Sequence, residues 1–238
     1  MTDILGHALL DYYNNDYSED IITESTISEA DEMPLPYLFR TYKEMPQLEQ
    51  KAMQLTKGNV LDVGCGAGSH SLYVQNVKKL EVTAIDISKG AAEVTALRGV
   101  KNAECKNLFD VTEKYDTILL LMNGIGLCGK LERINVFLQH LKNLLATDGQ
   151  ILLDSSDISY MFDKDDEGGF WVNPDEYYGE VEFTMSYKGN TSTAFDWLYL
   201  DFNTLQNACH ANGLDCELVL EGEHFDFLAR ITINNSPS

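Results

Sequence analysis

The stretch Val60-Leu61-Asp62-Val63-Gly64-Cys65-Gly66-Ala67-Gly68-Ser69-His70-Ser71-Leu72 decides the fold of this chain. An apolar run that carries an acid is followed by a glycine-dense turn and then by a sequence typical of a helix. Glycines at every second position allow positive φ angles and let the backbone pass close to a ligand. This order predicts a parallel strand that leads, through a tight turn, into the amino end of a helix facing a ligand.

A second acid, Asp86, indicates what kind of ligand the turn meets. It lies at the end of the next apolar run, 81–85, eighteen residues after Gly68. In nucleotide-binding folds an acid at this place accepts hydrogen bonds from ribose hydroxyls. The turn and the acid together predict a cofactor that contains adenosine.

The spacing of the glycines separates two classes of cofactor. Nicotinamide and flavin enzymes carry G-x-G-x-x-G, but here the third glycine comes one residue early and Ser69 takes the dinucleotide position. The pattern Asp-x-Gly-x-Gly-x-Gly, from Asp62 to Gly68, instead resembles motif I of the class I S-adenosylmethionine-dependent methyltransferases. The resemblance implies that S-adenosyl-L-methionine is the cofactor, that the turn packs against its methionine part, and that Asp62 helps to hold its ammonium group.

The same resemblance places further residues around the cofactor. It implies that Asp86 holds the ribose and that Ile87 covers it. It also implies that Asn107, where many relatives carry Asp, meets the adenine amino group, and that the Leu108 backbone reads the ring edge. The stretch 121–126, which begins with Leu121 after a later strand, would offer a carbonyl to the ammonium group and form part of the floor of the acceptor site. The expected cofactor-binding residues are Asp62, Gly64, Cys65, Gly66, Gly68, Asp86, Ile87, Asn107, Leu108 and Leu121.

Several residues near the turn also have a purely structural interpretation. Asp62 could cap the turn, and Asp86 could be a solvated acid at a strand end. Cys65 is expected to pack and to contribute its backbone, not to act as a nucleophile. His70 could line the cofactor pocket or cap its helix. Arg40, the first basic residue, could pair with the cofactor carboxylate or form a surface salt bridge with the acidic amino-terminal segment.

Alternation of strands and helices defines the fold class. Continuous apolar strands separated by helical stretches predict a parallel sheet covered on both faces. The order resembles the doubly wound, mostly parallel, seven-stranded α/β sheet of the methyltransferases, whose last strand runs antiparallel. Residues 1–56 are expected to form a helical cap or lid, and 57–238 the methyltransferase domain with a β-hairpin inserted at about 155–200. Strands are expected at 59–63, 80–85, 103–106, 115–121, 150–154, 214–220 and 224–231.

Two segments outside this core are rich in acids. Residues 1–39 hold nine acids and neither Lys nor Arg, and should form a short helix followed by a mobile acidic loop at 18–32. The span 154–182 holds ten acids and one Lys, and runs into an expected hairpin of 180–187 with 193–200. A cleft walled by carboxylates attracts cations. A neutral or cationic acceptor is therefore expected, although these acids could equally well face water.

Methyl transfer from a sulfonium requires little covalent catalysis by the protein, because the donor is already activated. Alignment of the acceptor and exclusion of water carry much of the rate, and a general base is needed only if the acceptor must lose a proton. Asp157, Tyr160 and His70 are candidates for such a base, and the sequence does not choose among them. Four aromatic residues could line an acceptor pocket or simply pack the inserted hairpin: Trp171, Trp197, Tyr177 and Tyr178.

Composition narrows the classes of function. The 238 residues include 17 Lys and Arg against 38 Asp and Glu, a net charge of −21. Nucleic-acid binders need clustered basic residues, so neither DNA nor RNA is expected as a partner. The sequence shows no signal peptide, membrane-spanning stretch or metal-ligand spacing. Its five scattered cysteines predict free thiols in a reducing cytoplasm.

The expected function is methyl transfer from S-adenosylmethionine to a small molecule. The acceptor, its nucleophilic atom and the oligomeric state are not contained in the sequence. A non-catalytic cofactor-binding module, such as a sensor or an assembly subunit, is the alternative from another class. A nicotinamide-dependent reductase on the same fold is disfavoured by Ser69.

Overall fold

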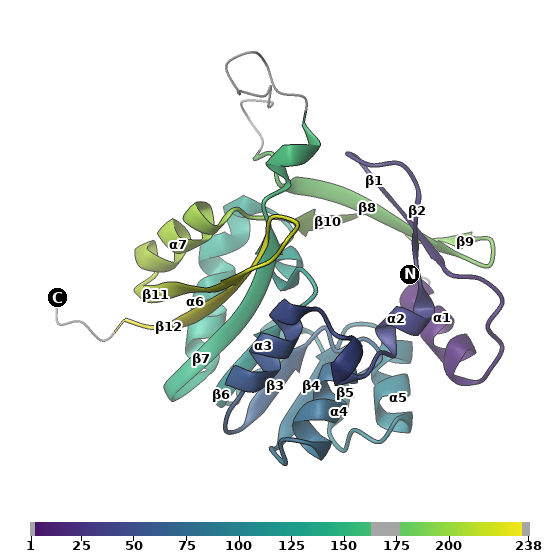
Figure 1. Cartoon of the computed structure of the whole chain (residues 1–238), viewed down its shortest axis with the longest axis horizontal. Coiled ribbons are helices and arrows are strands. Elements are labelled where there is room, and N and C mark those ends of the chain that lie inside the picture. Colours follow the sequence, from purple (N-terminus) through teal and green to yellow (C-terminus); the bar gives the residue numbers. More distant parts are fainter. Residues whose placement is uncertain (1–2, 163–176, 235–238) are drawn as a thin grey trace.

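Seven strands, most of them short apolar runs, form the central sheet of the protein (Figure 1). The computed structural model describes residues 3–162 and 177–234. The strand order is β11-β12-β7-β6-β3-β4-β5, and only β12 runs antiparallel to its neighbours. The strands are β3 (Val60–Val63), β4 (Val82–Asp86), β5 (Ala103–Cys105), β6 (Tyr115–Leu120), β7 (Leu145–Ser156), β11 (Leu214–Glu221) and β12 (Asp226–Ile233).

Helices cover both faces of this sheet because successive side chains of a strand point to opposite sides. Leu61 and Val63 pack with α6 and α7, whereas Val60 packs with α3 and α4. The predicted doubly wound α/β fold, with its last strand antiparallel, is confirmed. None of the helices in the described ranges has the length and apolar character needed to cross a membrane. The helices on the sheet are α3 (Gln47–Leu55), α4 (Ser69–Asn76), α5 (Lys89–Leu97), α6 (Ile134–Leu144) and α7 (Phe202–Ala211).

A second sheet combines the amino-terminal segment with the inserted hairpin. Its order is β10-β8-β1-β2, with β9 also paired to β8, and Figure 1 shows it across the upper right of the molecule. The helices α1 (Ile4–Tyr13) and α2 (Leu35–Leu38) flank β1 and β2 in the chain. The second-sheet strands are β1 (Ile21–Ser25), β2 (Asp31–Met33), β8 (Glu180–Tyr187), β9 (Asn190–Thr191) and β10 (Phe195–Leu198).

The prediction that 18–32 forms a mobile acidic loop is wrong for the residues that form β1 and the start of β2, because these are paired strands. Strand β1 pairs with β8, with Ile22 opposite Ser186, and Ile21 is fully buried. Because β8 lies far from β1 along the chain, the acidic sequence around β1 gives no local indication that it forms a strand. Strand β7 is also longer than predicted, and it continues through Asp148, whose φ of 59° bends it without ending it.

The predicted hairpin of 180–187 with 193–200 is present as β8 paired with β9 and β10. Lys188 and Gly189 turn the chain with φ values of 46° and 73°, as a tight hairpin requires. Strand β10 packs on the segment after β6, where a Cβ atom at Gly126 would lie 2.0 Å from Trp197 Cε2. This contact joins the second sheet to the central one.

A buried cluster of charges ties the amino-terminal segment to the central domain. Arg40 Nη2 donates to both carboxylate oxygens of Glu49 at 2.6 Å, and His70 Nε2 lies 2.6 Å from Glu49 Oε2. Burial alone would raise the pKa of Glu49 and lower the pKa of His70. The hydrogen bond between these two residues and the charges around them reverse both effects. The pKa of Glu49 is therefore lowered and the pKa of His70 is raised. The ion pair of Arg40 is therefore buried and made with α3, not exposed and made with the acids of 1–39.

We expect Glu49→Gln to lower the free energy of unfolding by about 3–5 kcal/mol, because it leaves the Arg40 guanidinium buried without its counter-charge. Since the pKa of His70 is raised by folding, its share of the stability is complete below about pH 6.5 and is lost as the pH rises through the folded-state pKa. Urea denaturation over a range of pH should therefore show a difference between the two proteins that shrinks at high pH.

The matched control for this prediction is Asp196→Asn, which removes an exposed ion pair with Lys130. Exposed pairs contribute about 0–1 kcal/mol. A loss for Glu49→Gln no larger than that of the control, or one that does not change with pH, would contradict the prediction.

Candidate functional site

The turn between β3 and α4 adopts the conformation that its glycines were expected to allow. Gly64, Gly66 and Gly68 have φ values of 71°, 54° and 80°. A Cβ atom at Gly68 would lie 2.8 Å from Thr95 Cγ2, so only glycine lets the turn approach α5 this closely. A Cβ atom at Gly66 would meet nothing within 4 Å. The backbone at Gly66 therefore faces open space, as a surface that cradles a ligand must.

The end of β4 holds this turn in place. The amides of Gly64 and Cys65 donate to the Ile85 carbonyl at 2.9 and 3.0 Å, and the Gly66 amide donates to Asp86 Oδ2 at 2.9 Å. Asp86 Oδ1 accepts from the Ser88 amide at 2.9 Å. Burial raises the pKa of Asp86, although these two amides work against the shift. Asp86 is thus a buried residue whose hydrogen bonds hold the turn in place. It is not the solvated acid at a strand end that the structural interpretation predicts.

Asp62 and Cys65 face the interior of the protein. Asp62 Oδ2 accepts from Ser71 Oγ at 2.5 Å, which ties the end of β3 to the first turn of α4. Burial raises the pKa of Asp62, opposed by the positive charge of His70. The Cys65 sulfur is buried 3.6 Å from Thr95 Oγ1, and burial raises the pKa of this thiol strongly. A thiol in this state is a packing group and a poor nucleophile.

The remaining predicted cofactor residues follow β4, β5 and β6. Ile87 is 75% exposed beside Asp86, an unusual place for a large apolar side chain. Asn107 Oδ1 accepts from the Phe109 amide at 2.9 Å, and the Leu108 carbonyl lies 2.8 Å from His140 Nε2. Leu121 is buried directly after β6. All these positions lie at the carboxyl ends of parallel strands, where ligands bind in open α/β sheets.

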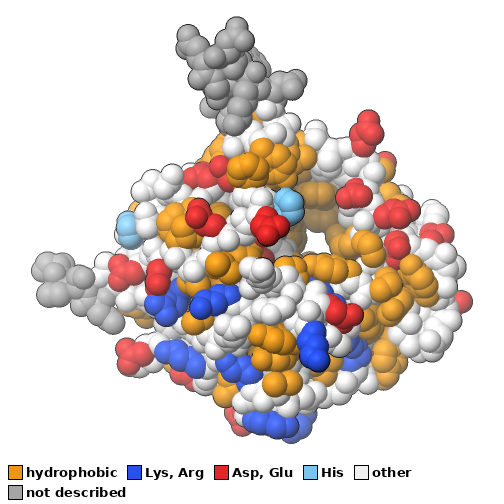
Figure 2. Space-filling model, in the orientation of Figure 1, with side chains coloured by type: hydrophobic (Ala, Val, Ile, Leu, Met, Phe, Trp, Pro, Cys, Tyr) orange, Lys and Arg blue, Asp and Glu red, His pale blue; other side chains and the backbone are white. Residues whose placement is uncertain are grey.

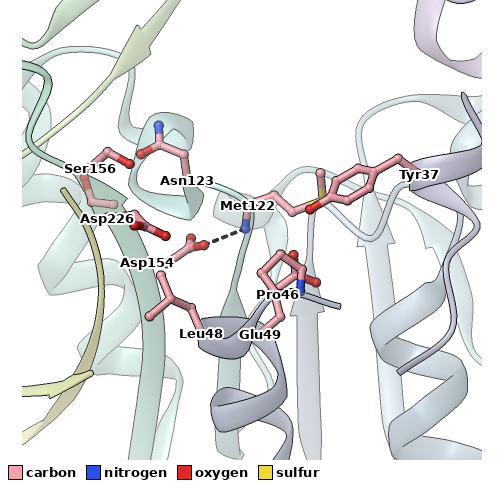
Figure 3. A pocket seen from close by; sticks show the side chains of 10 residues that line it. Tyr37, Pro46, Leu48, Glu49, Met122, Asn123, Asp154, Ser156 and Asp226 are labelled. Carbon is pink, nitrogen blue, oxygen red and sulfur yellow. Dashed lines mark hydrogen bonds between the residues drawn. The ribbon is translucent and has the colours of Figure 1, made fainter. Parts of the chain in front are cut away.

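An acid at the end of β7 braces the segment that follows Leu121. Asp154 accepts from the Met122 amide at 3.0 Å (Figure 3). It also accepts from the Gly124 amide at 2.9 Å. Met122 and Asn123 both have positive φ, 67° and 56°, although neither is glycine. Burial raises the pKa of Asp154 to about 7, with a further contribution from the negative charge of Glu49.

A cavity of about 310 Å³ opens beside this acid. Figure 2 shows a deep hollow in the face that Figure 1 presents, with hydrophobic side chains at its rim. In the close-up, Asp154 and Asp226 lie next to each other on one side, and Tyr37 lies on the other (Figure 3). The cavity is lined by Tyr37, Pro46, Leu48, Glu49, Met122, Asn123, Asp154, Ser155, Ser156 and Asp226.

Three of the four aromatic residues considered for an acceptor pocket, Trp197, Tyr177 and Tyr178, are not among the residues that line this cavity. Trp197 packs against Gly126, which agrees with hairpin packing. The hydroxyl of Tyr177 donates to Asp201 at 2.8 Å, and that of Tyr178 donates to Asp157 at 2.9 Å. Trp171 lies outside the described residues.

None of the three candidates for a general base is among the residues that line the cavity, although Asp157 directly follows Ser156 and His70 contacts Glu49. Asp157 accepts from the Ser159 amide as well as from Tyr178. Tyr160 is half exposed and stacks on Phe225, and His70 is held by Glu49. The base therefore stays unassigned. Among the described ranges, no group of three or more His, Cys, Asp or Glu side chains has a geometry that could hold a metal ion.

Two residues of the site were missed from the sequence, and for different reasons. Asp154 carries the same signal as Asp62 and Asp86, an acid at the end of an apolar strand, and could have been selected on it. Glu49 carries no such signal, because its role arises only where α3 meets Arg40 and His70.

Comparison with known proteins supports one family. A family profile described as a methyltransferase domain matches residues 60–149. No match was found among curated proteins. A S-adenosylmethionine-dependent methyltransferase from Bacteroides fragilis, solved in complex with S-adenosyl-L-homocysteine, shares 45% sequence identity. The similarity covers 97% of this chain and 94% of that one, with a TM-score of 0.90.

More distant structures share the fold alone. The CcbJ methyltransferase from Streptomyces caelestis is 12% identical over 85% of this chain and 100% of that one, with a TM-score of 0.60. The amino pentose methyltransferase CalS10 from Micromonospora echinaspora is 12% identical over 82% and 93%, with a TM-score of 0.53. From the 45% identity to the Bacteroides fragilis enzyme over almost the whole chain, this protein belongs to the S-adenosylmethionine-dependent methyltransferase family.

Proposed function

We propose that the chain transfers a methyl group from S-adenosylmethionine to a small, neutral or cationic acceptor held in the cavity beside Asp154. The observation that carries this proposal is the place of the cavity in the sheet. Its residues Met122 and Asp154 lie at the carboxyl ends of β6 and β7, and β6 is the direct neighbour of β3, whose end forms the glycine turn. Cofactor and acceptor would therefore meet along one edge of the sheet.

The residues at the glycine turn fit the cofactor. The open space at Gly66 leaves room for its methionine part, and the exposed Ile87 is free to cover the nucleoside. Asp86 uses two of roughly four acceptor sites of a carboxylate on its own backbone, which leaves capacity for ribose hydroxyls. When bound, S-adenosylmethionine supplies a methyl group already activated on a sulfonium. The protein then has to place the acceptor and exclude water.

The charge and size of the cavity support the class of acceptor. The lining includes Glu49, Asp154 and Asp226 and neither Lys nor Arg. Arg40 and His70 compensate the charge of Glu49, so the negative charge of the cavity comes from Asp154 and Asp226. A field of this sign concentrates cations and repels anions. The volume of about 310 Å³ lies at the lower end of small-molecule sites, so the acceptor would be small.

We infer the partners and the compartment of the protein from its net charge and its cysteines. A net charge of −21 argues against nucleic acid as a partner. All five cysteines are free thiols and four are buried, which supports a reducing compartment such as the cytoplasm.

Titration calorimetry tests the cofactor. We expect S-adenosylmethionine and S-adenosylhomocysteine to bind, with no comparable affinity for nicotinamide dinucleotides, because the turn lacks the dinucleotide spacing. Tight binding of NADH without a response to either sulfur compound would favour the reductase instead. Binding without formation of S-adenosylhomocysteine from a metabolite extract would favour a non-catalytic module.

Two substitutions test the placement of the cofactor. Asp86→Ala removes an acceptor for both ligand and turn, and should weaken S-adenosylhomocysteine binding by about 1–3 kcal/mol, roughly 5- to 150-fold in Kd. Gly66→Val should abolish binding, since a branched side chain fills the open space and is strained at positive φ.

Gly189→Val is the control for Gly66→Val. Gly189 also has positive φ and nothing within 4 Å of a Cβ atom, but it lies at the tip of the β8–β9 hairpin. It should bear the same backbone strain and keep its affinity for S-adenosylhomocysteine. If Asp86→Ala bound the ligand as tightly as wild type, the ribose assignment would be wrong.

A panel of acceptors tests the charge of the cavity. Acceptors that carry an amine should show kcat/KM falling as salt is added, because counter-ions screen the carboxylates. Neutral analogues of the same size serve as the control and should respond little to salt. Best turnover of an anionic acceptor, at rates insensitive to salt, would refute the charge argument and leave the family assignment intact.

A further inference from the structure

The segment after β6 holds two strained residues in succession. Met122 and Asn123 both have positive φ, 67° and 56°, and neither is glycine. Side chains at such positions crowd the backbone, and conformations of this kind persist only where the surroundings impose them. Something in the structure must therefore hold this turn.

Asp154 supplies that restraint. Its two carboxylate oxygens accept from the amides on either side of Asn123, at 3.0 Å from Met122 and 2.9 Å from Gly124. The Asn123 side chain adds a bond from Nδ2 to the Leu198 carbonyl of β10 at 3.1 Å. The carboxyl group of Asp154 is buried and lines the cavity. Strand β7 thereby fixes the backbone that follows β6 and lines the cavity.

We propose that the Asp154 carboxylate clamps the Met122–Gly124 turn, that protonation loosens this clamp, and that Asp154 thereby acts as a positioning residue for methyl transfer. The proposal rests on the proposed function of the site. Both amides are donors, so both oxygens must accept. Protonation removes the negative charge and turns one oxygen into a hydroxyl, which is a weaker acceptor, so the two bonds that hold the turn are weakened.

The surroundings of Asp154 place this protonation near neutral pH. Burial raises the pKa of Asp154 to about 7, and the Glu49 carboxylate on α3 adds to the shift. The two amides and the positive charge of His70 on α4 act in the opposite direction. Tyr37 on α2 and Asp226 on β12 also face the cavity. The turn should therefore be clamped above about pH 7 and loosened below it.

The first test is Asp154→Asn, measured by hydrogen exchange in the protein without acceptor. The amide NH₂ of Asn faces a backbone donor, so we expect the Met122 and Gly124 amides to exchange roughly tenfold faster or more. Asp226→Asn is the matched control, because it removes a charge from the same cavity without a bond to the turn, and the two amides should keep their protection. Kinetics of Asp154→Asn should show a loss in kcat larger than any change in KM for S-adenosylmethionine.

The second test uses wild-type protein alone, so it holds even if Asp154→Asn fails to fold. Protection of the Met122 and Gly124 amides, corrected for intrinsic exchange, should rise as the pH rises through about 7. In folded Asp154→Asn it should be flat over the same range. Unchanged protection in that variant, or pH-independent protection in wild type, overturns the proposal. Because exchange is read without turnover, failure of methyl transfer together with pH-dependent protection would overturn the proposed function and the positioning role, and would leave the clamp itself standing.

Discussion

The attachment of the glycine turn to the end of β4 is the constraint on which the rest of the site depends. Three successive amides, from Gly64 to Gly66, donate to acceptors on Ile85 and Asp86. The positive φ angles of the glycines allow these amides to converge on one strand end. The start of α4 and the open space at Gly66 are fixed relative to β4 as a result. A ligand meets a surface already in its binding shape.

Three acids at the ends of strands accept hydrogen bonds from neighbouring segments of the protein itself. Asp62 accepts from Ser71, Asp86 accepts from two amides, and Asp154 accepts from two more. A buried carboxylate is costly unless donors surround it, and each of these acids has donors from the segment it must hold. The same bonds set the direction of the free lone pairs, so the acceptor groups offered to a ligand are rigid.

The two sides of the site come from different parts of the chain. The range matched by the methyltransferase profile, 60–149, contains the glycine turn and the predicted nucleoside residues. Of the cavity's lining residues, only Met122 and Asn123 fall within it. The others come from the amino-terminal segment, the end of β7 and β12. The predicted cofactor residues thus lie within the shared domain, whereas most of the residues that line the cavity lie in the segments around it.

The sequence by itself determined the central sheet and the glycine turn after β3, because their signals are local. An apolar run, glycines that tolerate positive φ and an acid at a strand end are each legible within a dozen residues. Only the tertiary structure decided that β1 pairs with β8, that Glu49 joins Arg40 to His70, and that Asp154 clamps the turn after β6. In each of these the partners lie in distant segments, and the backbone pairing or buried charge that joins them leaves no pattern in either segment alone.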